Sequence, residues 1–349
     1  MENSTEFSSN RHSVALQEFE VPIRHPEFCF EDANIAVVAG HQYFLVHQGL
    51  LCHHSPVFRH VVRSLAMDKG RRIEGRPALP VQDPPEEMAQ LLRALYTFSF
   101  RMFASDFLVV SALLRMSTKY AIEDLRKEVL RTLLMSWPTT LPLWELREKA
   151  VTNADGMYAP RPNLPHPILM IELAREVNAP ELLPSAFYDL SRYLPSQLAT
   201  GYTHGSATHL LAADDLLRVL NGKELSARFF STFIVNELEG RLPSEWCLHR
   251  HQGDGHRARA CQMAFEAITF EVLRDVNGVV CNRNSDPLFA IVDSFLMQTR
   301  DDEPGVENRA VCRACEACRM EYAVAVEATR EEFWRRIPEW FDLQVKNWG

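Results

Sequence analysis

The sequence lacks the features that mark membrane and secreted proteins. No apolar run approaches the ~18 residues that a membrane-spanning helix needs, and residues 107–114, among the longest, stop far short. The opening residues, MENSTEFSSNRHS, are polar and contain no apolar core of a secretory signal. We therefore expect an intracellular protein, cytoplasmic or nuclear, that makes no membrane contact.

Motifs of common enzyme classes are missing as well. The sequence contains no Gly-rich phosphate loop, no Gly-x-Ser-x-Gly nucleophile elbow and no His-Glu-x-x-His zinc motif. Its 37 Lys and Arg are outnumbered by 46 Asp and Glu. The resulting net charge of −9 argues against sequence-independent binding to nucleic-acid phosphates. These absences predict that the protein is not an enzyme and does not bind nucleic acid.

The best-defined structural pattern lies in residues 32–58, which predict a hairpin leading directly into helices. The first strand begins at Ile35, the second covers residues 43–46, and Gly40 lies in the tight turn between them. Apolar residues then recur at helical spacing, and Pro56 stands where a new helix can begin. The stretch is therefore the start of a small domain that contains both strands and helices.

This stretch resembles the opening of a BTB/POZ domain. The matching residues are Asp32, the hairpin, Val46-His47, Leu50-Leu51 and Ser55-Pro56-Val57-Phe58. The likeness is closest to BTB proteins of basidiomycete fungi, on residues 74–77 and 91–96. BTB domains are interaction modules, so the resemblance implies protein partners and a homodimer. Residues 14–21 could supply an exchanged segment for that dimer.

Two departures from the family pattern bear on the kind of partner. Transcription-factor members carry a basic residue just after the His, whereas this sequence has Gln48, so we expect Asp32 to be exposed or differently paired. Cullin adaptors carry a hydrophobic-x-Glu element in the loop after the helix that begins at the Ser-Pro pair. In the corresponding loop this chain has only Asp68 as a substitute for the Glu. A cullin-type ubiquitin ligase adaptor and a transcriptional regulator are therefore kept as the two alternatives.

With 349 residues, of which 46% are hydrophobic, the chain can form two or three domains. We predict an α+β fold, in which a small BTB/POZ domain is followed by mostly helical regions. The predicted segments are a flexible leader (1–25), the BTB/POZ domain (26–136), a connector (137–165), a helical domain (166–240) and a Cys-containing helical module (241–349).

The helical region gives two further expectations. Residues 166–240 are predicted to be helical throughout, with one helix that ends at Asn221-Gly222, because these residues suit a left-handed exit. A last helix is predicted over residues 318–336, before Pro338.

Cysteine spacing near the end of the sequence carries the clearest chemical signal. Two residues separate Cys315 from Cys318, a spacing that lets both thiolates reach one zinc ion at about 2.3 Å. A tetrahedral site needs two more ligands, and the nearest cysteines upstream are Cys247 and Cys261. We therefore predict a structural zinc site of Cys247, Cys261, Cys315 and Cys318, which leaves no open position for a catalytic water.

Other readings of these residues stay open. Cys312 could replace Cys318, and His249, His251 and His256 lie in the loop between the upstream cysteines. Reduced thiols without a metal are the simplest alternative, since a reducing compartment keeps cysteines free.

Overall fold

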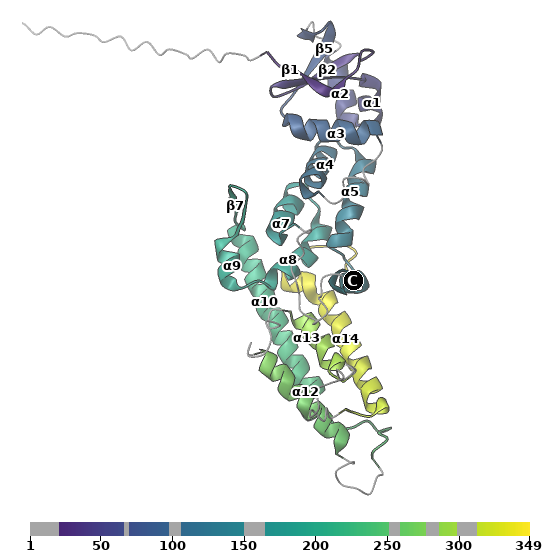
Figure 1. The fold of residues 1–349 in the computed structure, drawn as a ribbon, viewed down its shortest axis with the longest axis vertical. Coiled ribbons are helices and arrows are strands. Elements are labelled where there is room, and N and C mark those ends of the chain that lie inside the picture. Colours follow the sequence, from purple (N-terminus) through teal and green to yellow (C-terminus); the bar gives the residue numbers. More distant parts are fainter. Residues whose placement is uncertain are drawn as a thin grey trace, which may run out of the picture. The chain divides into compact units, whose positions relative to one another are not determined.

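The computed structural model describes residues 21–65, 70–97, 106–149, 165–250, 259–276, 286–298 and 313–349. It divides into two compact units, shown in Figure 1. The first comprises Met1–Ala104 and Leu108–Arg126, and the second comprises Ser105–Phe107 and Lys127–Gly349. Within the described residues, no helix combines the length and apolar character needed to cross a membrane. The proposed exchange segment at 14–21 lies outside the described residues, except for Val21.

The first unit is built on a five-stranded sheet with the strand order β1-β3-β2-β5-β4. The strands are β1 (Ile23–Cys29), β2 (Ile35–Ala39), β3 (Gln42–Val46), β4 (Arg72–Ile73) and β5 (Arg76–Val81). The predicted hairpin is confirmed: β2 and β3 pair antiparallel, and Gly40 turns between them with φ at 52°. Strand β1 was not predicted; its Pro26 is tolerated because β1 is an edge strand.

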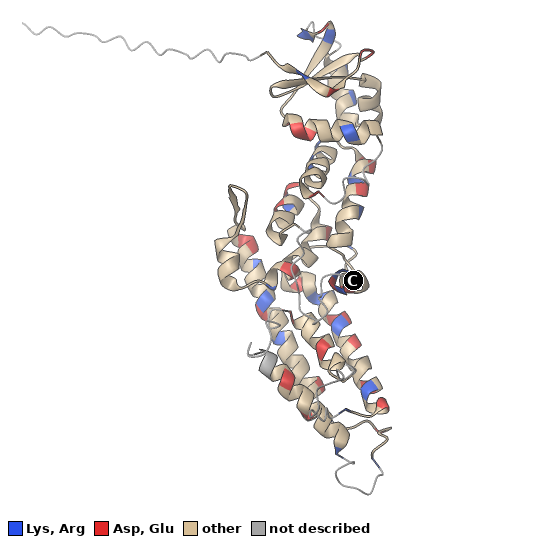
Figure 2. Cartoon of the chain, viewed as in Figure 1, with Lys and Arg blue, Asp and Glu red and all other residues tan. Residues whose placement is uncertain are grey.

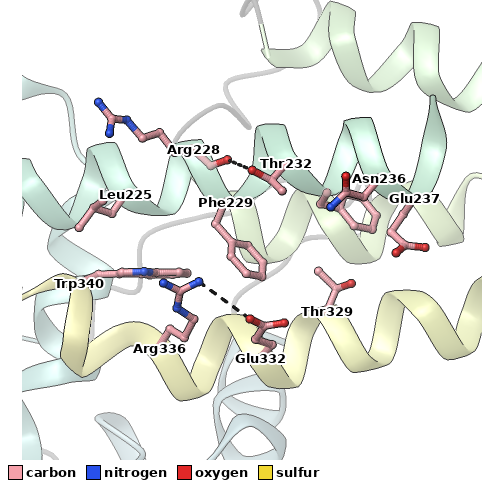
Figure 3. A pocket seen from close by; sticks show the side chains of 11 residues that line it. Leu225, Arg228, Phe229, Thr232, Asn236, Glu237, Thr329, Glu332, Arg336 and Trp340 are labelled. Carbon is pink, nitrogen blue, oxygen red and sulfur yellow. Dashed lines mark hydrogen bonds and ion pairs between the residues drawn. The ribbon is translucent and has the colours of Figure 1, made fainter.

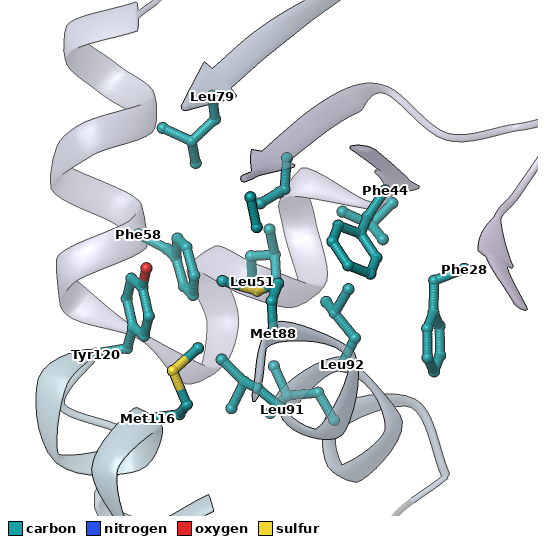
Figure 4. Packing of buried hydrophobic residues seen from close by; sticks show 14 of the residues in the cluster. Phe28, Phe44, Leu51, Phe58, Leu79, Met88, Leu91, Leu92, Met116 and Tyr120 are labelled. Atoms are coloured by element: carbon teal, nitrogen blue, oxygen red, sulfur yellow. The ribbon is translucent and has the colours of Figure 1, made fainter. Parts of the chain in front are cut away.

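Helices cover one face of this sheet. They are α1 (Gln48–His54), α2 (Pro56–Leu65) and α3 (Pro85–Thr97), as Figure 1 shows. Helix α4 (Phe107–Lys119) contributes Met116 to the same core, and α5 (Glu123–Ser136) runs from the first unit into the second. Alternate residues of β2, such as Ile35 and Val37, point into the core with Phe58 and Met88, as Figure 4 shows for the last two. Ala36 belongs to a smaller cluster on the other face. The predicted α+β class is confirmed.

The break between α4 and α5 is fixed by polar contacts around Tyr120. Ala121 takes a left-handed φ of 51°, a conformation that ends α4 just before it. The Tyr120 hydroxyl donates to Asp83 at 2.5 Å, and Ser55 donates to the Tyr120 carbonyl at 2.6 Å. Burial, together with the Asp83 carboxylate, raises the pKa of Tyr120. The residue therefore stays a neutral donor that joins α4 to the start of α2 and α3.

The second unit is mostly helical. Its helices are α6 (Leu141–Lys149), α7 (Pro167–Glu176), α8 (Leu183–Ser191), α9 (Pro195–Thr200), α10 (Ala213–Phe233), α12 (Ala260–Val276), α13 (Pro287–Leu296) and α14 (Glu316–Trp340), with a π-helical turn at Ile234–Leu238. The prediction of helix throughout 166–240 is wrong at one point. Strands β6 (Tyr202–His204) and β7 (Ala207–His209) form a hairpin, because Gly205 adopts a φ of 59° that a tight turn requires.

The predicted helix end at Asn221-Gly222 is also wrong, since α10 continues through both residues. Gly222 is buried, and a Cβ built on it would lie 2.2–2.6 Å from three ring atoms of Phe341. The glycine therefore makes room for the Phe341 ring and does not end the helix.

Helix α14 is longer than the predicted 318–336 and includes Pro338 in its last turn. A proline has no N–H, so it leaves the carbonyl four residues earlier, that of Trp334, without its helical donor. The indole N–H of Trp348 donates to that carbonyl at 2.7 Å, and the Trp334 and Trp348 rings stack with centroids 4.8 Å apart. The end of the chain thus compensates for the proline.

A buried ion network joins α6, α8 and the start of α13. Arg147 contacts Asp189 at 2.6 Å, and Arg192 contacts Asp189, Glu148 at 2.9 Å and Asp286 at 2.7 Å. Burial alone would raise the pKa of Asp189, but the two guanidinium groups outweigh burial and lower it to about 2. The carboxylate is therefore ionised and holds both arginines.

Candidate metal centre

Four cysteines from three separate segments meet in the second unit. Cys247 lies in a turn closed by a bond from its N–H to the Ser244 carbonyl at 3.0 Å. Cys261 is in the first turn of α12, Cys315 precedes the first residue of α14, and Cys318 lies in the first turn of α14. All four are buried. The fold therefore concentrates thiols at the adjoining starts of two helices.

The spacing of the four sulfurs fits one tetrahedral ion. All four Sγ atoms lie within 4.8 Å of one another, with Cys247 Sγ 3.6 Å from Cys261 Sγ and 3.8 Å from Cys315 Sγ. Four sulfurs placed about 2.3 Å from a central zinc would be about 3.8 Å apart. The separations are far longer than a disulfide bond of about 2.0 Å, and all four cysteines are free thiols. The arrangement suits a metal ion better than a disulfide.

Backbone N–H groups point at the sulfurs. The N–H of Ser244 donates to Cys318 Sγ at 3.3 Å, and the N–H of Cys315 donates to Cys261 Sγ at 3.2 Å. Such donors stabilise a thiolate, the form that binds metal. The sequence gives no signal for these donors, because they come from the main chain and from the turn geometry.

The thiols differ in acidity. Burial would raise the pKa of Cys315, but N–H donors of Cys318 and Leu248 outweigh it and lower the pKa to about 6. Burial raises the pKa of Cys261 to about 11 and also raises that of Cys318. The Cys315 thiolate is therefore favoured without a metal, whereas Cys261 and Cys318 would ionise only with the help of a cation.

The structure brings together all four residues of the favoured ligand set. His249 is described but does not belong to the group of ligand atoms within 4.8 Å. Cys312, His251 and His256 lie outside the described residues.

In the first unit, Asp32 and His47 are in contact at the strand-to-helix junction. The Asp32 carboxylate lies 3.1 Å from His47 Nε2, and the Asp32 side chain is 83% exposed. The other ring nitrogen of His47 lies 2.8 Å from the Tyr96 hydroxyl. The expectation that Asp32 is exposed or differently paired beside Gln48 is therefore confirmed. His47 is hydrogen-bonded, as expected for a structural histidine.

The first unit corresponds to a known domain family. Its structure is a five-stranded sheet with helices on one face, in which a hairpin leads into a Ser-Pro helix start. Residues 25–135 match the family model of the BTB/POZ domain, so this part of the chain is a BTB/POZ domain. No curated protein matches the chain. The domain is a protein–protein interaction module, not a catalytic fold.

Proposed function

We propose that this chain is a non-enzymatic protein that joins protein partners through its BTB/POZ domain and that it forms a homodimer through the same domain. The observation that carries the proposal is the match of residues 25–135 to this interaction module. We propose an intracellular location, cytoplasmic or nuclear, because cysteines that are reduced or bound to zinc are typical of reducing compartments.

The proposed dimer surface includes α1 and α2. Leu50, Val57 and Val61 lie at the edge of the domain core and are only partly buried. Apolar side chains that stay partly exposed gain free energy when a second copy covers them.

Analytical ultracentrifugation of the full chain tests self-association. We expect a concentration-dependent dimer that Val61→Arg weakens at least tenfold. The neighbouring His60→Arg, at an exposed position of the same helix, serves as the matched control and should leave the dimer unchanged. A chain that stays monomeric at all concentrations would refute the homodimer.

Two narrower functions belong to this proposal and can be tested directly. A substrate adaptor of a cullin-type ligase predicts direct binding of a purified cullin, and absence of binding at micromolar concentration counts against it. A transcriptional regulator that contacts DNA predicts measurable binding at low salt, where phosphate contacts are strongest. Membership of the basidiomycete group stays a prediction from the resemblance alone.

We propose further that Cys247, Cys261, Cys315 and Cys318 hold a structural zinc ion. Support comes from four buried Sγ atoms within 4.8 Å and from N–H donors directed at the sulfurs. Four thiolates fill a tetrahedral shell, so such an ion would join the turn at Cys247 to α12 and α14 and would not activate water.

Elemental analysis of protein purified without added metal tests the zinc site. We expect about one zinc per chain in the unaltered protein and none in Cys318→Ser. Cys52→Ser, at a half-buried free thiol of the first unit, is the matched control and should keep its zinc. Zinc well below one per chain in the unaltered protein would contradict the proposal.

A further inference from the structure

Helix α2 of the first unit carries positive charge and no negative charge. No Asp or Glu occurs in the sequence between Asp32 and Asp68, although acidic residues outnumber basic ones over the whole chain. Within α2, Arg59 and Arg63 are exposed, and so is His60 between them. Figure 2 shows, in contrast, that both signs of charge occur along α14. The excess of positive charge is therefore a local property of α2.

The two arginines of α2 have no carboxylate partner among the described residues. Arg59 donates from Nε and Nη2 to the Cys52 carbonyl, at 3.1 and 2.8 Å, and its remaining guanidinium N–H groups stay available. Arg63 forms neither a hydrogen bond nor an ion pair through its side chain within the described part of the chain. Elsewhere in the same unit, Arg93 is paired with Glu27. The charge of α2 is therefore not neutralised inside the domain.

The groove between α10 and α14 in the second unit shows the opposite situation. Its charged lining residues are paired within the chain: Arg336 contacts Glu332, as Figure 3 shows, and Arg228 contacts Glu224. A partner would have to compete with these internal carboxylates before it gained an ion pair of its own. No such competition arises at Arg63.

One carboxylate of a neighbouring element acts on the end of α1. Asp124, in the first turn of α5, interacts electrostatically with His54, in the last turn of α1. No ion pair joins Asp124 to either arginine of α2 in the residues that the structure describes. We therefore leave α1 out and define the α2 basic surface as Arg59, His60 and Arg63.

The α2 basic surface and the apolar residues of the proposed dimer surface lie on different sides of the helix. Arg59 and Arg63 are each two residues away from Val61, which places them about 160° from it around the helix axis. Phe58 and Val62, which are buried in the domain core, separate the two sides. A second copy that covers Val61 would therefore leave both arginines accessible.

We infer that the α2 basic surface binds an acidic segment of a partner protein. The inference rests on the proposed interaction role of the BTB/POZ domain and specifies the chemistry of its partner. Arg59 and Arg63 stand about 6 Å apart along the helix axis. Alternate residues of an extended chain point to the same side about 6.6 Å apart, so two carboxylates of one segment can contact both arginines.

Nucleic acid fits the α2 basic surface less well. The surface extends over little more than one helical turn, whereas proteins that hold nucleic acid through its backbone make about 6–10 phosphate contacts. The net charge of −9 also repels a long polyanion. A short acidic segment needs only the local charge.

Fluorescence anisotropy with the full chain tests the inference. The probe is a labelled ten-residue peptide in which Glu alternates with Ser, and the comparison peptide has Gln in place of Glu. We expect the Glu peptide to bind at least tenfold tighter than the Gln peptide in about 50 mM salt. Its binding should weaken as the salt concentration rises, because salt screens exposed charges. A ten-nucleotide single-stranded DNA should bind no tighter than the Glu peptide.

Variants of single arginines locate the binding surface. Arg63→Glu should weaken binding of the Glu peptide at least tenfold, whereas Arg63→Lys, which keeps the charge, should weaken it less than threefold. Arg335→Glu in α14 is the matched control, because Arg335 is exposed and has no ion pair in the described residues. This control should change binding less than twofold. Circular dichroism confirms that each variant is folded.

Three results would overturn the inference: equal binding of the Glu and Gln peptides, equal effects of Arg63→Glu and Arg335→Glu, or tighter binding of the DNA than of the Glu peptide. Analytical ultracentrifugation of the same samples keeps the homodimer separate. A chain that dimerises without binding the Glu peptide refutes the acidic partner alone. A chain that binds the Glu peptide but stays monomeric refutes the homodimer alone.

Discussion

Replacement of Gly222 by alanine tests the packing of α10 against the end of the chain. An alanine inside a helix gains about 1 kcal/mol over glycine when its methyl group has space. Here the methyl group would lie 2.2–2.6 Å from ring atoms of Phe341, and the buried position of this ring prevents a simple displacement. Overpacking of this kind costs about 1–3 kcal/mol, and contacts this short favour the upper end. We therefore expect a net loss of about 2 kcal/mol in the free energy of unfolding.

Removal of the Phe341 ring should reverse the sign of the stability change that Gly222→Ala causes. Phe341→Ala alone should cost about 3–5 kcal/mol as a large core truncation. In that background Gly222→Ala should stabilise by up to about 1 kcal/mol, because only the helix propensity remains. Asn221→Ala, at the exposed neighbouring position, should gain about 0.5 kcal/mol in either background. Urea unfolding followed by circular dichroism measures all of these values. Stabilisation by Gly222→Ala in the unaltered protein, or equal losses in both backgrounds, would refute the reasoning.

Three further predictions concern the second unit. Asp189→Asn should lower the free energy of unfolding by about 3–5 kcal/mol, because it weakens a buried ion network around Arg147. Its control, Glu331→Gln at an exposed position, should change that free energy by less than about 0.5 kcal/mol in the same urea measurement. Burial lowers the pKa of His166 from 6.5 to about 4 in the folded protein, so the unfolded chain is protonated at a higher pH than the folded one. The contribution of His166 to the free energy of unfolding is therefore complete above about pH 6.5 and declines as the pH falls toward 4. His166→Asn should flatten this part of the stability profile, and an unchanged slope would contradict the assignment. Trp348→Phe should cost about 1 kcal/mol through the lost bond to the Trp334 carbonyl, while Trp246→Phe, at an 81% exposed position, should be near neutral in thermal unfolding.

Local chemistry explains why the first unit could be predicted from its sequence. The hairpin at Gly40 and the helix start at Pro56 depend on residues adjacent in sequence, whose backbone preferences are strong. Strand β1 was missed because its pairing with β3 depends on a partner distant in sequence, and Pro26 weakens its strand pattern.

Errors in the second unit have the opposite cause. Gly222 has the local signature of a helix end, but a contact with Phe341 far along the chain decides its role. Pro338 similarly predicts a helix end that the Trp348 indole compensates. The cysteine set could be chosen from spacing and proximity, since few thiols lie nearby. The N–H donors of Ser244 and Cys315 could not be predicted, because every residue except proline has a main-chain N–H and the sequence does not show where it points.

The cysteine cluster has a consequence for how the second unit tolerates changes in length. Cys247, Cys261 and Cys315 meet at one point, although 14 and 54 positions separate successive members in sequence. The 54 positions from Cys261 to Cys315 contain α13 and almost all of α12, so contacts among the cysteines close a loop around both helices. The entropy cost of closing such a loop grows only slowly with its length, by about 0.6 kcal/mol for each doubling. We therefore expect the packing of α12 and α13 to depend more on the cysteines that close the loop than on the number of residues within it.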